Sequence, residues 1–354
     1  MNTTISFAAP TLPRRVLKLF AALCAGALSA VSAHGAPNLY AGSDISIETL
    51  TSSDPWYAPI GGVVKDGDTL YFGNFRTIRS YDLTTGADSV YASIPGNNDT
   101  KGLGMLNGNL YIAYDTGGYP TYGSALSVVS PSGHTEVLTS GNGVDSYSIY
   151  DAVVHDGNYY FTANPGMGGS LQGTRIYRLD LDDPANPFLV ADIGGLSGGL
   201  AFDGDGNLYY ASQNSGEGIL RFDAADVLAG GLSAADGFTV VNVAASNIGF
   251  LSSGELLAGI MDGQMLASYN IATGNRNDIA FTTDLEYMGK FVVDGDNIYL
   301  SSTDWSYDSD YVSSLYAITL PSAVPEPSSM LMLLSGLAFL GYFRPRSCKT
   351  NHTC

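Results

Sequence analysis

Three charged residues, Lys101, Asp151 and Lys290, each stand near the start of an apolar segment in an otherwise acidic chain. A carboxylate between two ammonium groups can hold a polar ligand through charge-assisted hydrogen bonds. The same three groups can instead satisfy one another as ion pairs. Because they lie far apart in the sequence, the elements that position them decide whether either role is available.

A second candidate ligand-binding group is the segment 304–311, in which Trp305 and Tyr307 alternate with aspartates. Aromatic rings stack on the C–H faces of sugars, and carboxylates accept hydrogen bonds from sugar hydroxyls. The alternative is that these rings are buried for their area alone. We take Trp305 and Tyr307 as candidate ligand-binding residues.

The motifs that would carry catalysis or metal binding are incomplete. Residues 195–199 read Gly-Leu-Ser-Gly-Gly, but a hydrolase of this pattern needs a strand-to-helix elbow, and no helix is expected here. Asp203, Asp205 and Asn207 resemble the start of a calcium loop, but its twelfth position is Asn214 instead of Glu. We therefore predict a structural loop and a plain turn, with no catalytic residue, no metal site and no cofactor.

Composition favours a chain of short strands and tight turns. Gly occurs 43 times and Tyr 23 times in 354 residues, and only 14% of residues are charged. The formal net charge is -19, so the chain would repel phosphate backbones and nucleic-acid binding is not expected. The cysteines, Cys24, Cys348 and Cys354, lie near the two ends, so no disulfide is expected in between.

A short phrase, an apolar run that meets a turn glycine and returns as a second apolar run, recurs six times. Its turn glycines are Gly67, Gly108, Gly157, Gly206, Gly254 and Gly295. They are 41 to 49 residues apart, and a period of roughly 40–50 residues with several strands per unit is typical of a β-propeller. We predict an all-β, six-bladed propeller over residues 40–321, with one helical turn near 224–228.

The last repeat ends after its third strand, whereas the segment 45–50, Ile-Ser-Ile-Glu-Thr-Leu, precedes the first repeat and has no partner there. We predict that this N-terminal strand closes the last blade, because pairing the two open edges joins the ends of the ring. The first-to-second strand turns are then tight glycine turns that leave no room for a site. The long loops at the opposite face would hold any site, with Lys101, Asp151 and Lys290 around the axis.

The phrase Phe-Asp-x-x-Gly-Asn-Leu-Tyr at 202–209 resembles propellers of the NHL-repeat and gluconolactonase-like kind. The resemblance covers the body as an architecture. It implies, as an alternative function, a metal-dependent lactonase-like hydrolase at the channel mouth. Asp151 and Asn247 would be candidates for its metal ligands, although a full ligand set cannot be mapped.

Residues 1–33 read as a secretory signal peptide: Arg14, Arg15 and Lys18 precede an apolar run that ends in Val-Ser-Ala. We expect cleavage after Ala33, with Gly35 or Ala36 as alternatives. The alternative to a signal peptide is a first core helix.

The segment 322–346 combines Pro325-Glu326-Pro327, a nearly uninterrupted apolar run over 330–343 and a basic end, and a short tail follows over 347–354. The apolar run predicts a short transmembrane helix whose basic end stays in the cytoplasm. This order resembles the PEP-CTERM sorting signal of Gram-negative bacteria, with Pro325, Glu326 and Pro327 as the recognition motif. The resemblance implies recognition by an exosortase-type membrane peptidase; the alternative is an ordinary single-span anchor.

These features together predict an exported propeller, held in the inner membrane before processing and then placed at the cell surface or outside the cell. We expect it to bind a ligand or to act as a structural module in an exopolysaccharide-associated envelope. Its partners would be the exosortase-type peptidase, the inner membrane and an extracellular polysaccharide.

Overall fold

The computed structural model describes residues 39–321, except for eleven internal segments. These segments are 53–59, 75–76, 95–99, 117–122, 141–148, 165–172, 182–185, 214–215, 261–263, 283–285 and 305–312. The predicted signal peptide, the predicted sorting segment, Trp305 and Tyr307 therefore lie outside the described residues. Among the helices that are described, none is long and apolar enough to cross a membrane.

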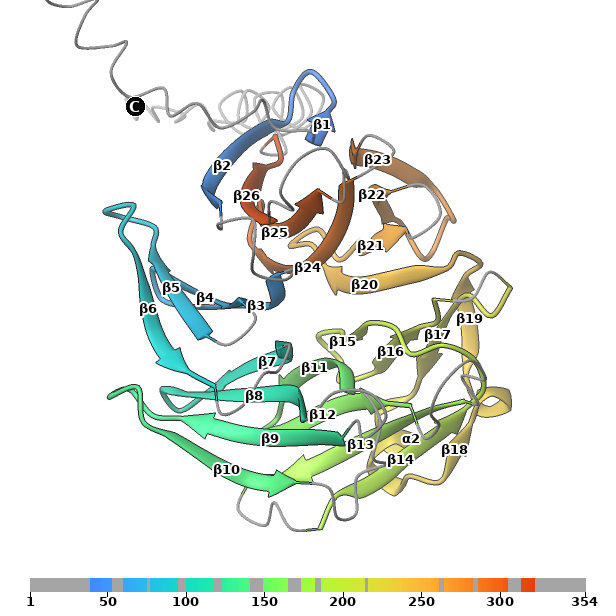
Figure 1. Ribbon diagram of the computed structural model, residues 1–354. Helices are drawn as coiled ribbons and strands as arrows, with labels where there is room; N and C mark the ends of the chain where they lie inside the picture. The colour runs from blue at the N-terminus through green and yellow to red at the C-terminus, as the bar shows by residue number, and fades with distance from the viewer. Residues whose placement is uncertain are drawn as a thin grey trace, which may run out of the picture. The chain divides into compact units, whose positions relative to one another are not determined.

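The described chain contains six sheets, each built around four antiparallel strands, and they confirm the predicted six-bladed propeller (Figure 1). We number them as blades 1 to 6 in chain order. From the innermost strand outwards, blade 1 consists of β3 (Ile60–Asp66), β4 (Thr69–Asn74), β5 (Thr77–Asp82) and β6 (Asp88–Ser93), and blade 2 of β7 (Thr100–Leu106), β8 (Asn109–Thr116), β9 (Gly123–Val129) and β10 (Thr135–Ser140). Blade 3 consists of β11 (Ile149–His155), β12 (Asn158–Ala163), β13 (Thr174–Asp180) and β14 (Phe188–Ile193), and blade 4 of β15 (Leu200–Phe202), β16 (Leu208–Ala211), β17 (Ile219–Phe222) and β19 (Phe238–Val241). Blade 5 consists of β20 (Ala245–Phe250), β21 (Leu256–Ile260), β22 (Met265–Tyr269) and β23 (Arg276–Thr282), and blade 6 of β24 (Glu286–Asp294), β25 (Asn297–Asp304), β26 (Ser313–Thr319) and β2 (Ser46–Ser52).

The N-terminal strand closes the last blade as predicted, since β2 pairs antiparallel with β26. A further strand that the sequence did not reveal, β1 (Leu39–Ala41), adds to the outer edge of blade 5 beside β23. Between β17 and β19 the chain forms the expected short helix α2 (Ala224–Ala229), then β18 (Leu232–Ser233) and the 3-10 turn η1 (Ala234–Asp236). β18 pairs parallel with β14, so this connection within blade 4 adds a fifth strand to the outer edge of blade 3.

The repeated hairpins owe their geometry to the six turn glycines. All six have positive φ, between 54° and 81°, a region that a side chain with a Cβ atom enters only with strain. Asn107 and Asp156, which precede two of these glycines, also have positive φ, as residues of a type I′ turn require.

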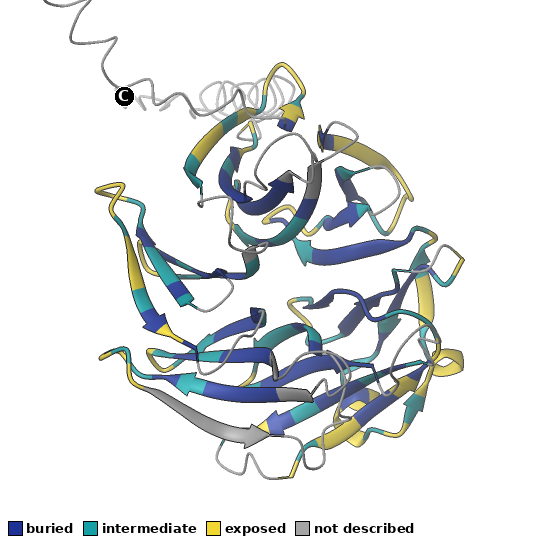
Figure 2. Cartoon of the chain, in the orientation of Figure 1, coloured by how far each residue is buried: buried dark blue, intermediate teal, exposed yellow. Residues whose placement is uncertain are grey.

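The core lies between the blades, where consecutive sheets pack face to face (Figure 2). Buried side chains form six clusters, and each cluster joins two neighbouring blades. The last cluster contains Val63 and Phe72 of blade 1 together with Tyr299 and Leu315 of blade 6. The hydrophobic core is therefore continuous around the ring, and it closes where the two ends of the propeller meet.

Candidate functional site

Five of the six inner strands carry an irregular register, and these bulges position the polar residues at the axis. The register of β7 shifts between Thr100 and Gly102, that of β11 between Ile149 and Ala152, and that of β24 between Met288 and Phe291. Bulges re-aim side chains that a regular strand would point into the sheet packing. Lys101, Asp151 and Lys290 each lie inside one of these three bulges.

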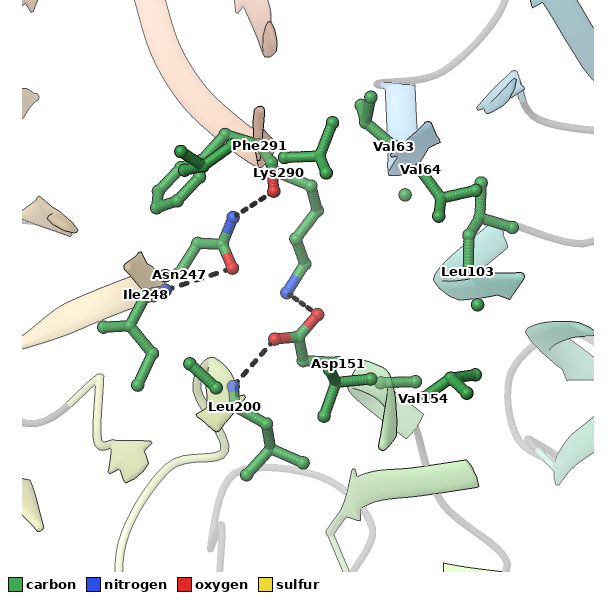
Figure 3. A pocket seen from close by; sticks show the side chains of 18 of the residues that line it. Val63, Val64, Leu103, Asp151, Val154, Leu200, Asn247, Ile248, Lys290 and Phe291 are labelled. Carbon is green, nitrogen blue, oxygen red and sulfur yellow. Dashed lines mark hydrogen bonds and ion pairs between the residues drawn. The ribbon is translucent and has the colours of Figure 1, made fainter. Parts of the chain in front are cut away.

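Asp151 and Lys290 meet across the channel, although they come from opposite blades, 3 and 6. Lys290 Nζ lies 3.0 Å from Asp151 Oδ1, and the two side chains are only 12% and 8% exposed. The backbone N–H of Leu200, in blade 4, donates to Asp151 Oδ2 at 2.9 Å (Figure 3). Both carboxylate oxygens of Asp151 are thus occupied by groups of the chain itself.

The electrostatics of Lys290 are dominated by its burial. Burial lowers the pKa of Lys290, the Asp151 carboxylate opposes that shift, and the charge of Lys101 adds to it. The ammonium group also lies 4.0 Å from the centre of the Tyr150 ring, a distance suited to a cation–π contact. Lys101, which is partly exposed, therefore acts on Lys290 through its charge. The ion pair described here is formed by Asp151 and Lys290.

Asn247 lies beside this pair and binds protein groups with both ends of its amide. Its Nδ2 donates to the carbonyl of Phe291 at 3.4 Å, and its Oδ1 accepts the N–H of Ile248 at 3.1 Å. In the part of the chain that the structure describes, no three His, Cys, Asp or Glu side chains form a group able to hold a metal ion. Asp151 and Asn247, the two candidate ligands of the metal site that the lactonase resemblance implied, both bind groups of the chain itself.

From the Asp151–Lys290 pair, a cavity of about 380 Å³ extends along the inner strands toward the tight turns. The lining comes from all six blades and is mainly apolar. Its residues are Gly62, Val63, Val64, Lys65, Leu103, Gly104, Met105, Asp151, Ala152, Val153, Val154, Leu200, Ala201, Phe202, Asn247, Ile248, Gly249, Phe250, Lys290, Phe291, Val292 and Val293. In Figure 3, Lys290 reaches across the channel to Asp151, and the apolar side chains surround the pair.

The expectation that the tight-turn end leaves no room is wrong. The lining reaches Lys65, Phe202, Phe250 and Val293, each next to a hairpin turn, and these residues are partly exposed. Tight turns bend back within each blade, so they leave the space between the six blades free. The apolar residues just before the turn glycines were the feature of the sequence that could have indicated this cavity. Whether their side chains face the axis depends on the bulges, which the sequence does not reveal.

The serine of the Gly-Leu-Ser-Gly-Gly stretch is part of a buried network, as expected for a structural loop. Ser197 is fully buried, its Oγ donates to Asn164 Oδ1 at 2.8 Å, and it lies 3.1 Å from Thr174 Oγ1. None of the hydrogen bonds described for Ser197 involves a histidine, the base that commonly activates a serine nucleophile.

The Asp203 carboxylate is also engaged, by hydrogen bonds from its own hairpin. Asp203 accepts hydrogen bonds from the backbone N–H groups of Asp205 and Asn207, from Asn207 Nδ2 and from the Tyr209 hydroxyl. Burial would raise the pKa of Asp203, but these hydrogen bonds outweigh it and lower the pKa. The segment is a turn stabilised by an aspartate, in keeping with the plain turn predicted from the sequence.

Comparison with known proteins adds an assignment at the C-terminal end. The model of the PEP-CTERM protein-sorting motif matches residues 323–347. These residues include Pro325, Glu326 and Pro327, which the sequence singled out. No curated protein matches the chain.

Several solved structures share the fold at low sequence identity. A luciferin-regenerating enzyme is 14% identical, with 78% of this chain and 95% of that chain covered and a TM-score of 0.60. Regucalcin from Agrobacterium tumefaciens, described as a calcium-binding protein, is 12% identical, with coverage of 78% and 95% and a TM-score of 0.55. The PQQ-bound aldose sugar dehydrogenase from Streptomyces coelicolor is 14% identical, with coverage of 79% and 100% and a TM-score of 0.52.

At such identities the likeness concerns the fold alone. The chain is a six-bladed β-propeller that carries a PEP-CTERM protein-sorting motif at residues 323–347.

Proposed function

We propose that the protein is an exported, surface-destined propeller that acts as a ligand-binding or structural module in an exopolysaccharide-associated envelope. The observation that carries this proposal is the sorting motif at 323–347 on a closed propeller. In this proposal residues 1–33 are a signal peptide, 40–321 the propeller, 322–346 the sorting and anchor segment, and 347–354 a short tail. The partners would be the inner membrane, an exosortase-type peptidase that reads Pro325, Glu326 and Pro327, and extracellular polysaccharide.

The groups that a hydrolase would need are engaged in structural contacts, and this favours binding over catalysis. Both oxygens of Asp151 are occupied, the Asn247 amide bridges to blade 6, and Ser197 is buried. A lactonase-like reaction would first have to break the Asp151–Lys290 ion pair, which is costly for buried charges.

Mass spectrometry of the protein recovered from its producing cells tests the sorting role. The native chain should lose its C-terminal segment near Pro325, and the triple variant Pro325→Ala/Glu326→Ala/Pro327→Ala should retain it. The matched control Ser322→Ala should be processed normally. Equal processing of all three proteins would overturn the sorting role.

A glycan array probed with the purified protein tests the proposed polysaccharide ligand, and Trp305→Ala and Tyr307→Ala test the two aromatic candidates. Hydrolysis assays with aliphatic lactones distinguish the proposed binding role from the alternative, a lactonase-like enzyme. Turnover that Asp151→Asn abolishes would contradict a binding role.

A further inference from the structure

We propose that the axial cavity at the tight-turn end is a binding site for a small organic cation with an apolar body, such as an aryl- or alkylammonium ion. This inference rests on the proposed ligand-binding role and names its ligand class. Its site differs from the long-loop face, where the sequence predicts the candidate residues Trp305 and Tyr307.

The size and lining of the cavity suit the apolar body of such a ligand. About 380 Å³ lies within the range of small-molecule sites, at its lower end. Among the described residues that line this cavity, only Lys65, Asp151 and Lys290 are charged. Burying an aromatic or aliphatic group there would remove apolar surface of both partners from water.

The inner end of the cavity holds the buried Asp151–Lys290 ion pair. Lys290 and Asp151 neutralise each other at 3.0 Å, and Lys290 Nζ is inaccessible to solvent. A ligand would therefore place its apolar part toward this end. A charged ligand group is better accommodated at the outer end, where lining residues are partly exposed.

The outer end selects the sign of that charge. The six hairpin turns around it carry eight carboxylates and one lysine. The carboxylates are Asp66, Asp68, Asp156, Asp203, Asp205, Glu255, Asp294 and Asp296. Lys65 is paired with Asp294 at 2.9 Å, so the remaining field at the mouth is negative.

Aromatic rings at the mouth add to the preference for a cation. Phe202 and Phe250 both line the cavity and are partly exposed. Phe202 stacks on His155 with ring centroids 3.9 Å apart, and Phe250 makes an edge contact with Tyr209, so both rings are held in place. Ring faces attract ammonium groups.

Calorimetric titration of the full chain with four probes tests this inference. The probes are benzyltrimethylammonium, benzyl alcohol without the charge, benzoate with the opposite charge, and tetramethylammonium without the apolar body. We expect benzyltrimethylammonium to bind at least roughly tenfold more tightly than each of the others, since both burial and charge contribute.

Variants locate the binding. Val64→Phe and Val293→Phe, on two different blades, should each fill the cavity and weaken binding of benzyltrimethylammonium about tenfold or more. Asp66→Asn/Asp156→Asn should weaken it about two- to fivefold and reduce its salt dependence. The control Asp44→Asn/Asp226→Asn, which removes two exposed carboxylates elsewhere, should leave binding unchanged. Circular dichroism melting identifies any filling variant that does not fold, and the rim variant then remains as the test.

Equal affinity for benzyl alcohol or benzoate would overturn the inference, as would tetramethylammonium binding as tightly as its benzyl derivative. Binding that both folded filling variants retain would overturn it as well. A chain that is processed normally near Pro325 but binds none of the probes would refute this site alone and leave the sorting role intact.

Discussion

Two lysine–aspartate pairs bridge blades of the same ring, and they differ mainly in burial. Lys290 and Asp151 join blades 6 and 3 at 3.0 Å with side chains 12% and 8% exposed. Lys65 and Asp294 join blades 1 and 6 at 2.9 Å with side chains 19% and 51% exposed. Burial lowers the pKa of Lys290, whereas the hydrogen bond with Asp294 raises the pKa of Lys65.

The comparison shows that one pair of residue types serves two purposes in this channel. The inner pair removes two charges from water, so each partner depends on the other. The outer pair stays partly hydrated and contributes little beyond local charge. The four predictions below test this difference, from the largest expected effect to the smallest.

Asp151→Ala should have the largest effect on stability. It leaves the buried ammonium of Lys290 without its counter-ion, which costs about 3–5 kcal/mol in the free energy of unfolding. Denaturant unfolding of the purified protein measures the loss. The matched variant Asp294→Ala should lose less than about 1 kcal/mol. Equal losses in the two variants would show that burial does not distinguish the pairs.

Replacing both partners of the inner pair should restore most of that stability. Asp151→Leu/Lys290→Met leaves no buried charge, and such replacements are often neutral or stabilising by about 1–4 kcal/mol. A double-mutant cycle with the two single variants measures the coupling free energy. Additive losses would contradict a direct interaction between the two side chains.

The two lysines should affect the pH dependence of stability in opposite directions. Because the folded chain holds the Lys290 proton less tightly than the unfolded chain, its contribution to stability rises with pH up to the unfolded value of about 10.4. Lys65 holds its proton more tightly when folded, so its contribution is present below about 10.4 and is lost as pH rises further.

Unfolding free energies of the native chain minus those of Lys290→Met or Lys65→Met, measured from about pH 7 to 11, test both signs. The difference removes the contribution of tyrosines such as Tyr209, whose pKa burial raises to about 12. Two curves of the same slope would contradict the comparison.

Lys65→Met should have the smallest effect, a loss of less than about 1 kcal/mol that high salt removes, as expected for a partly exposed pair. Unfolding in about 1 M salt, where the screening length falls to roughly 3 Å, measures this sensitivity. A loss that persists at high salt would show that the outer pair is shielded from solvent like the inner pair, and would contradict the comparison.

The sequence was sufficient to predict the ring because its signals are local and repeated. Six glycines with positive φ occupy equivalent turns. The last repeat lacked a fourth strand, and the unpaired segment at the N-terminal end of the propeller could supply it. β1, by contrast, has only three residues and no periodicity, so nothing in its sequence marked it as the edge of blade 5.

The site was only partly predictable. Lys101, Asp151 and Lys290 were chosen by their place near the start of the inner strands, and their ligand-binding role stays a prediction. Which of them form an ion pair depends on the bulges, because a shift of one residue turns a strand side chain to the opposite face. The cavity at the tight-turn end escaped prediction for the same reason, since it arises from the spacing of six blades and not from any one segment.

The most direct test of this account is a crystal structure of the propeller grown near neutral pH and soaked in calcium. We predict that Lys290 Nζ remains within ion-pair distance of Asp151 Oδ1, with no metal ion at the axis beside Asn247. A calcium ion bound to Asp151 and Asn247, with Lys290 displaced, would contradict the account and favour a metal-dependent enzyme.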